Sequence, residues 1–147
     1  MNILQATTDH LDHVARLFNQ YRVFYGVESD LKLAQEFIGE RLSNNESVVF
    51  LALDSNGEAV GFTQLYPSFS SVSVQKIWIL NDLFVNGDFR GQGVGKALLN
   101  AAKQFAEGTK AKGIALETAH DDVSAQHLYE TLGYQKDTRY YHYFLTL

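Results

Sequence analysis

The sequence predicts a single α/β domain with a mixed, mainly antiparallel twisted sheet of about six or seven strands and about four helices. Three observations support this expectation. Apolar residues recur at helical spacing in two early and two late segments, and the middle of the chain contains three consecutive strand-like runs. A glycine-rich turn, "RGQGVG", separates the third run from the next helical segment. A meander followed by crossover helices is typical of one α/β domain, so residues 1–147 are assigned to one domain.

The first elements are a strand over residues 2–7 and a helix that Thr8 or Asp9 caps and Gly26 ends. A second helix is expected from about Leu31 to Leu42. Its predicted buried stripe comprises Leu33, Phe37, Ile38 and Leu42.

Three strands are expected next. "SVVFLALD" is the first, and Asn56-Gly57 is a strong hairpin signal that leads into "EAVGFTQLY". Pro67 is expected to begin a Ser-rich loop, and the third strand covers about Gln75 to Val85.

After the glycine turn, a helix is expected with Val94, Leu98, Ala101 or Ala102, and Phe105 on its apolar face. "GIALETA" is expected to be a buried strand. Asp121 or Asp122 is expected to cap a helix through Leu132, with Gly133 as a left-handed C-cap. "TRYYHYFLTL" is predicted to form the final strand.

Composition excludes several classes of function. The net charge of −5 argues against a general nucleic-acid binder, because such proteins cluster Lys and Arg to neutralise phosphates. The chain has no cysteine, so disulfides and thiolate chemistry are excluded. The N-terminal segment contains no long apolar run, so we expect neither a signal peptide nor membrane association, and a cytoplasmic protein is expected. Three late histidines, His120, His127 and His142, lack metal-ligand spacing, so no metal is predicted.

Three kinds of phosphate-binding loop could account for the glycine turn. A Walker A loop fails because its first glycine would fall at Arg90 and Ala97 would replace the magnesium-binding Ser or Thr. A dinucleotide fingerprint fails because Lys96 occupies its third glycine position and a meander precedes the turn. The pattern Arg/Gln-x-x-Gly-x-Gly/Ala is matched in full by Arg90, Gly93 and Gly95.

With that pattern, "LNDLFVNGDFRGQGVGKALL" is similar to motif A of the GNAT N-acetyltransferase superfamily. "TAHDDVSAQHLYETLGY" is similar to its motif B, through Asp122, Ala125, Tyr129, Gly133 and Tyr134. The resemblance implies a GNAT-like fold whose central strands splay apart to admit acetyl-CoA as the co-substrate. Within the strand motif, the chain is nearest to polyamine- or diamine-type acetyltransferases.

The resemblance also implies how the cofactor would be held. Consecutive N–H groups at the helix start would bind the diphosphate, and the glycines would allow its close approach. Arg90 and Lys96 either add positive charge there or are solvated residues at the end of the helix. The pantetheine arm would pair with the backbone of the preceding strand. The expected cofactor-binding residues are Leu83, Phe84, Val85, Arg90, Gly91, Gln92, Gly93, Val94, Gly95, Lys96, Asp122, Ala125 and Tyr129.

Two catalytic residues are expected. Tyr129 occupies the position where the family often places the acid that protonates the leaving thiolate, although it could instead only pack on its helix. Asn81 stands where polyamine-type relatives often have a Glu that acts as base, so Asp82 becomes the candidate base, with Glu117 as a second candidate. Strand alternation places Asn81 and Asp82 on opposite faces unless a bulge intervenes.

The expected acceptor pocket contains Tyr25, Glu28, Asp30, Tyr66, Asn81 and Asp82, and Tyr140, Tyr141 and Tyr143 are further candidates. Acidic and aromatic groups suit an alkylammonium ion. The resulting hypothesis is transfer of an acetyl group to a primary amine of a small molecule, directly within a ternary complex. The alternatives are a protein lysine or N-terminal acetyltransferase and a non-catalytic acyl-CoA-binding module. Relatives of this type are often homodimers, and "YYHYF" fits either a dimer interface or the core of one subunit.

Overall fold

The computed structural model describes all residues from Met1 to Leu147. Their contacts group them into two compact units, Met1–Leu116 and Glu117–Leu147, which are described separately. The first unit holds a five-stranded sheet in the order β1-β2-β3-β4-β5. Neighbouring strands are antiparallel except β4 and β5, which are parallel. The assignment of residues 1–147 to one domain stays a prediction.

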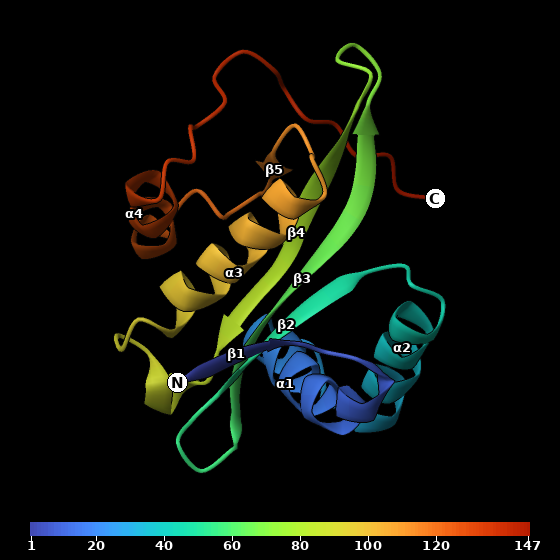
Figure 1. The fold of residues 1–147 in the computed structure, drawn as a ribbon, viewed down its shortest axis with the longest axis vertical. Coiled ribbons are helices and arrows are strands. Elements are labelled where there is room, and N and C mark those ends of the chain that lie inside the picture. The colour runs from blue at the N-terminus through green and yellow to red at the C-terminus, as the bar shows by residue number, and fades with distance from the viewer. The chain divides into compact units, whose positions relative to one another are not determined.

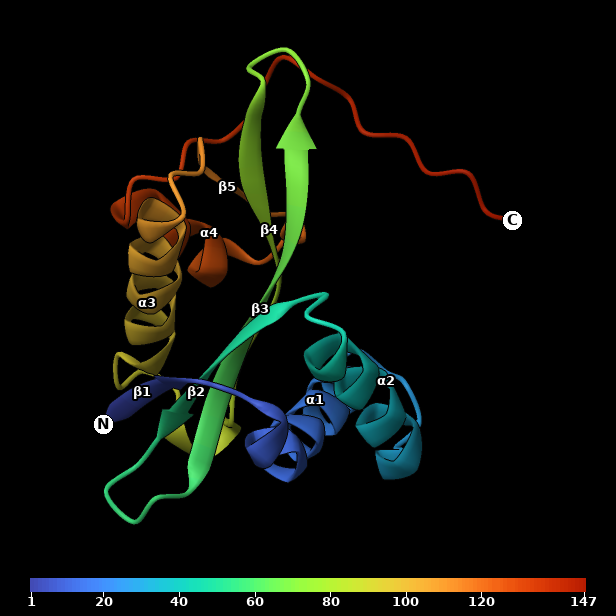
Figure 2. The same ribbon diagram turned by 45° about the vertical axis from the view of Figure 1, so that its right-hand side comes forward.

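The elements of the chain are as follows. The strands are β1 (Asn2–Gln5), β2 (Val48–Leu53), β3 (Ala59–Ser70), β4 (Gln75–Val85) and β5 (Ile114–Ala115). The helices are α1 (Leu11–Phe24), α2 (Leu31–Ser43), α3 (Val94–Gly108) and, in the second unit, α4 (Val123–Thr131). Short 3-10 turns cover Thr8–His10 and Gly87–Phe89. In the first unit, α1 and α2 cover one face of the sheet and α3 covers the other (Figures 1 and 2).

The sequence predicted the helices well but not all of their caps and faces. Thr7, not Thr8 or Asp9, caps the first helical segment, because its hydroxyl accepts from the Asp9 N–H and completes a capping box with His10. On α2 the buried residues are Ala34 and Ile38. Of the predicted stripe, Ile38 is fully buried and Leu42 packs partly buried against the core, but Leu33 is 48% exposed and Phe37 is 37% exposed, and Ala34 is buried instead.

The second strand of the predicted hairpin is longer than expected. Pro67 lies within β3, opposite Trp78, and the turn begins only at Ser71. Strand β2 begins at Val48, opposite Leu65, so the far half of β3 is a sheet edge on that side. Proline is tolerated on such an edge because no ladder hydrogen bond needs its missing N–H. The prediction of a loop from Pro67 was therefore wrong.

The sheet has five strands, not six or seven. Strand β5 is two residues long, and residues 138–147 form no strand. In this last segment Tyr140, Tyr141, Tyr143 and Phe144 are all exposed. Aromatic residues favour a strand only when a neighbouring strand supplies hydrogen bonds and packing, and no such pairing forms here.

A close contact under α3 fixes the sheet against that helix. Gly61 of β3 lies beneath α3, and a Cβ atom built there would come within 3.2 Å of Val94 and 3.3 Å of Leu98. The buried face of α3 comprises Val94, Leu98, Leu99, Ala102 and Ala106. The predicted member Phe105 is half-buried and instead packs its ring edge against Trp78 and Phe50. The N-terminus of α3, which carries the glycine turn, is thereby held at the end of β4.

Candidate active site

A β-bulge in β4 places the main polar cluster of the sheet. Gln64 pairs with Asp82 but Leu65 pairs with Leu80, so Asn81 is an extra residue in β4. Beyond the bulge, even-numbered residues of β4 face α1 instead of α3. The ring of Trp78 packs on α3, whereas that of Phe84, six residues later, packs on Tyr21 of α1. Asp82 therefore leaves the α3 side and faces α1.

The bulge also brings the side chains of Asn81 and Asp82 together. The Asn81 amide donates to Asp82 Oδ1 at 3.2 Å. Strict alternation would have separated the two residues, so this juxtaposition depends on the one extra residue.

Asp82 is a buried carboxyl group, only 4% exposed. Gln64 Nε2 donates to its Oδ2 at 2.6 Å, and Ser47 Oγ donates to Gln64 Oε1 at 2.8 Å, which orients that amide. Burial raises the pKa of Asp82, while hydrogen bonds from Gln64, Asn81 and Tyr21 act in the opposite direction. The result is a carboxylate that is well hydrogen-bonded but held in a poorly solvated place, which makes it a better proton acceptor than a surface aspartate.

Tyr66 lies on the same face of β3, two residues beyond Gln64. Burial and the nearby charge of Asp82 raise the pKa of Tyr66 to about 12, although the charge of Arg41 acts in the opposite direction. Tyr66 therefore keeps its proton at neutral pH and can donate a hydrogen bond, but it cannot act as a base.

The glycine turn presents unpaired donors at the start of α3. Gly91 and Gly93 have φ values of +74° and +81°, and Gly93 is the N-cap of the helix. The first helical bond to this cap runs from the Ala97 N–H to the Gly93 carbonyl at 3.0 Å. The N–H groups of Val94, Gly95 and Lys96 have no partner in the chain. With the helix dipole behind them, they form an anion-binding end.

Arg90 points back toward β4. Its Nε donates to the Val85 carbonyl at 3.0 Å, and its guanidinium lies 4.9 Å from the ring centroid of Phe24 and 5.8 Å from that of Phe84. Arg90 thus ties the start of the turn to the end of the strand. In this conformation the guanidinium forms cation–π contacts with both aromatic rings.

The far part of β4 has an unpaired edge. Its pairing with β5 covers only Trp78↔Ile114 and Ile79↔Ala115. From Leu80 to Val85 the strand has no neighbour on that side, so backbone groups of Leu83 and Val85 can pair with an extended ligand. This edge leads directly to the donors at the start of α3.

A comparison with known protein families identifies the family of this chain. The model of the acetyltransferase (GNAT) family matches residues 12–134. The chain belongs to the GNAT acetyltransferase family.

Relatives of this GNAT acetyltransferase agree with that assignment. Over 147 residues it is 51% identical to the uncharacterized N-acetyltransferase YhfO of Bacillus subtilis, with 100% of this chain and 98% of that protein covered. The crystal structure of a probable acetyltransferase superposes with a TM-score of 0.95 at 43% identity, over 100% of this chain and 98% of the other. The chain is thus an acetyl-CoA-dependent N-acetyltransferase with the predicted α/β fold.

A more distant structure shares the fold of this GNAT acetyltransferase. It is AAC(6')-Iy in complex with the bisubstrate analog CoA-S-monomethyl-acetylneamine. It superposes with a TM-score of 0.80 at 24% identity and covers 99% of this chain and 98% of its own.

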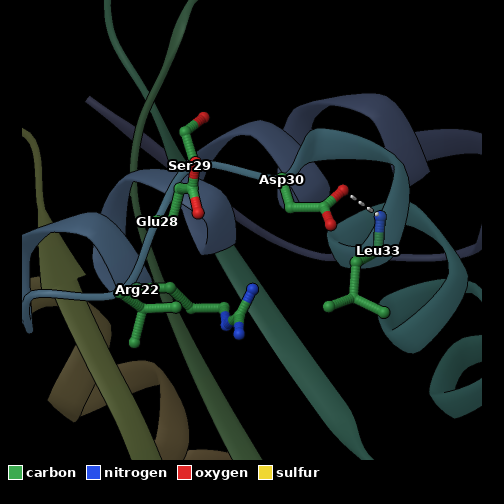
Figure 3. Close-up of a pocket in the computed structure, with 6 residues that line it drawn as sticks. Arg22, Glu28, Ser29, Asp30 and Leu33 are labelled. Atoms are coloured by element: carbon green, nitrogen blue, oxygen red, sulfur yellow. Dashed lines mark hydrogen bonds between the residues drawn. The ribbon is translucent and has the colours of Figure 1, made fainter.

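Between α1 and α2 the enzyme has an open pocket of about 390 Å³. Glu28 and Asp30, two of the predicted acceptor residues, line it with Arg22, Val27, Ser29 and Leu33 (Figure 3). Tyr25 does not line it; its ring packs edge-to-face against that of Tyr21, with 5.0 Å between the ring centroids. Asp30 is also the N-cap of α2, since its Oδ1 accepts from the Leu33 N–H at 3.1 Å. The predicted acceptor residues other than Tyr25 are therefore divided between this pocket and the Asp82 cluster.

The second unit carries the motif B residues. Asp122 caps α4 by accepting from the Ala125 N–H at 3.1 Å, as one of the two predicted caps. The ring of Tyr129 lies 5.8 Å from that of Tyr134. Glu117 is the first residue of this unit. The catalytic and cofactor-binding roles of these residues stay predictions.

Sequence reasoning did not find Tyr21, Arg22, Ser47 or Gln64. The one signal in the sequence was Gln64 itself, a long polar side chain in the otherwise apolar run "EAVGFTQLY". No group of three or more His, Cys, Asp or Glu side chains is placed to hold a metal ion. None of the helices is both long and apolar enough to cross a membrane.

Proposed function

We propose that this enzyme transfers the acetyl group of acetyl-CoA to a primary amine of a small molecule, directly in a ternary complex in the cytoplasm. The observation that carries this proposal is the buried Asp82 carboxylate, held by three side chains on a strand whose other edge is unpaired. It offers a proton acceptor beside a place where an extended ligand can bind.

The residues of the glycine turn fit the diphosphate of coenzyme A. Cβ atoms built at Gly91 and Gly93 would meet nothing within 4 Å, so the space in front of both residues is open. The unpaired N–H groups of Val94, Gly95 and Lys96 supply donors, and exposed Lys96 adds charge. Backbone groups of Leu83 and Val85 would hold the pantetheine arm, while the buried side chain of Phe84 keeps the strand in place. Acetyl-CoA supplies an activated thioester.

Asp82 would act as the general base. A primary ammonium has a pKa of about 10.4, so it must lose a proton before its nitrogen can form the new C–N bond. Asp82 would take this proton, directly or through one water, while Gln64 and Asn81 keep its oxygens aimed. Asn81 and Tyr66 would contact the acceptor beside it.

Tyr129 would supply the second proton transfer. When the C–S bond breaks, the sulfur becomes a thiolate that gains from a donor. A phenol with a pKa of about 10 can protonate it. Asp122 and Ala125 would set the start of α4 and so the position of Tyr129.

Small molecules are favoured as acceptors by two observations. The enzyme has an open pocket at the α1–α2 junction, and its fold is shared by AAC(6')-Iy, whose bisubstrate analog contains acetylneamine. A peptide would need an extended groove.

The first experiment is calorimetric titration with acetyl-CoA, with NADH and ATP as controls. Selective binding of acetyl-CoA is expected, followed by release of free thiol with a panel of small primary amines. Turnover only on peptides bearing lysine or a free N-terminus would instead indicate a protein acetyltransferase. Binding without turnover on any amine or peptide would leave an acyl-CoA-binding module.

A homodimer is the predicted assembly. Light scattering at several protein concentrations tests it, since a monomer mass throughout would contradict the prediction.

A further inference from the structure

The pocket at the α1–α2 junction contains an arginine whose side chain has no bonded partner in the chain. Arg22, in the last turn of α1, is half-buried and lines the pocket. Its side chain forms no hydrogen bond, ion pair or ring contact, and its Nη1 atom is shielded from solvent without an acceptor. A guanidinium carries five N–H donors, and leaving those of the shielded Nη1 unpaired is costly.

The two carboxylates of the pocket are not bonded to Arg22. Neither Glu28 nor Asp30 forms a salt bridge with Arg22, since the ion pairs of the chain are those of Arg41. Asp30 is committed to capping α2. In Figure 3 its carboxylate faces the Leu33 N–H, away from Arg22.

The loop that forms the pocket wall is fixed. Asn19 accepts from the Asp30 N–H at 3.0 Å through Oδ1 and donates from Nδ2 to Ser29 Oγ at 3.0 Å. The Val27 N–H bonds to the Arg22 carbonyl at 3.0 Å. Because both ends of the loop are tied to α1, the open space beside Arg22 is built into the backbone.

The pocket is joined to the proposed base through α1. Tyr21, the residue before Arg22, hydrogen-bonds to Asp82, and its ring packs on Phe62 and Phe84. One turn of helix therefore carries a contact to the buried carboxylate and an unpaired cation in the neighbouring pocket.

We propose that Arg22 binds a carboxylate of the acceptor, so that the acceptor is an amino acid or a similar small amine bearing an acidic group. This inference rests on the proposed function. A guanidinium fork matches a carboxylate in a bidentate manner, so a bound carboxylate would pair the N–H groups that the pocket leaves accessible. A polyamine would instead bring an ammonium group, which has donors and no acceptor, against the unpaired donors of Arg22. Arg22 itself thus favours an acceptor with a carboxylate over the polyamine-type acceptors that the strand motif suggested.

The test compares amino acids with their decarboxylated amines, which differ only by the carboxylate. The pairs are lysine and 1,5-diaminopentane, leucine and 3-methylbutylamine, and phenylalanine and 2-phenylethylamine. Thiol release is measured for the wild type, Arg22→Gln and Arg22→Lys. Lys103→Gln on the exposed face of α3 is the matched loss of one positive charge.

For at least one pair, the wild type is expected to favour the amino acid by roughly ten- to a hundredfold in kcat/KM. Arg22→Gln is expected to abolish that preference through KM, with kcat little changed. Arg22→Lys restores part of it, and Lys103→Gln retains all of it. A preference for the amines, or an Arg22→Gln variant with unchanged preference, would overturn the inference while leaving the acetyltransferase proposal intact.

A binding measurement keeps the two proposals separate. If no amine is turned over, NMR titration of the same six compounds still tests the pocket. Amino-acid binding that Arg22→Gln removes would support the anion site although the proposed function fails, and no difference within any pair would contradict the site.

Discussion

Gln64 Nε2 donates a 2.6 Å hydrogen bond to Asp82 Oδ2 between two buried side chains on neighbouring strands. Since Ser47 holds the Gln64 oxygen, the amide cannot rotate without losing a second bond. Asp82 is therefore presented in one orientation. Its role in the reaction can be tested by removing its charge while keeping its size.

Asp82→Asn is expected to lower kcat roughly 100- to 10,000-fold, because the amide cannot accept the proton of the ammonium group. Affinity for acetyl-CoA should change little. Thiol release and calorimetry measure the two effects. Asp12→Asn, at an exposed position of α1, is the control and should behave as the wild type. A variant at Asp82 that retains wild-type kcat would remove this residue from the mechanism.

The raised pKa of Asp82 also predicts a pH dependence of stability. Between the unfolded and the folded pKa, the folded state binds more protons, so this group's contribution to stability falls as the pH rises through the folded value. Relative to Asp82→Asn, the wild type should therefore gain stability as the pH falls from neutral toward the ordinary aspartate range. Denaturant unfolding of both proteins at several pH values measures this difference. A difference that is independent of pH would contradict the shift.

Gly93→Val is expected to weaken acetyl-CoA binding far more than folding. The positive φ of Gly93 makes any side chain there cost about 1–2 kcal/mol, and the new atoms would project into the open space in front of the donors. Gly57→Val is the matched control, because Gly57 has φ +80° in the hairpin turn and a Cβ there also meets open space. Equal losses of cofactor affinity in both variants would argue against a diphosphate site at the turn.

Tyr129→Phe is expected to reduce kcat by roughly 100-fold or more, with acetyl-CoA affinity preserved, since only the proton donor is removed. The neighbouring Tyr134 provides the control. Its hydroxyl is buried without a partner, so Tyr134→Phe should leave the activity unchanged. Stopped-assay kinetics with a fast acceptor compare the two. Similar kcat values for both variants would assign Tyr129 a packing role.

Two glycine-to-alanine changes should shift stability in opposite directions. Gly61→Ala places Cβ 3.0 Å from the Phe84 carbonyl and tight against α3, so a loss of about 1–3 kcal/mol is expected. Gly39→Ala, inside α2, meets Leu11 only at an ordinary 3.6 Å and should gain about 0.5–1 kcal/mol. Thermal unfolding of both variants measures the effects. A stabilised Gly61→Ala would mean that α3 can move away from the sheet.

The sequence by itself determined the family and most of the elements. The motif with Arg90, Gly93 and Gly95 was recognisable because backbone approach to a ligand requires glycine at set positions. Apolar periodicity located α1 to α3, and Asp122 and Gly133 delimited α4, since caps and periodicity are local properties. The strand that fails to form over residues 138–147 shows the limit of local reasoning. Strand propensity acts only through a partner.

Only the tertiary structure decided which side chains meet. The single extra residue Asn81 turns Asp82 toward α1, and no local pattern marks where a bulge falls, because it depends on the register of two strands. The same holds for Gln64, whose amide reaches Asp82 across the sheet, and for Arg22, whose lack of a partner is visible only when every nearby carboxylate has been placed. Long-range pairing and burial create these properties, and both belong to the folded chain.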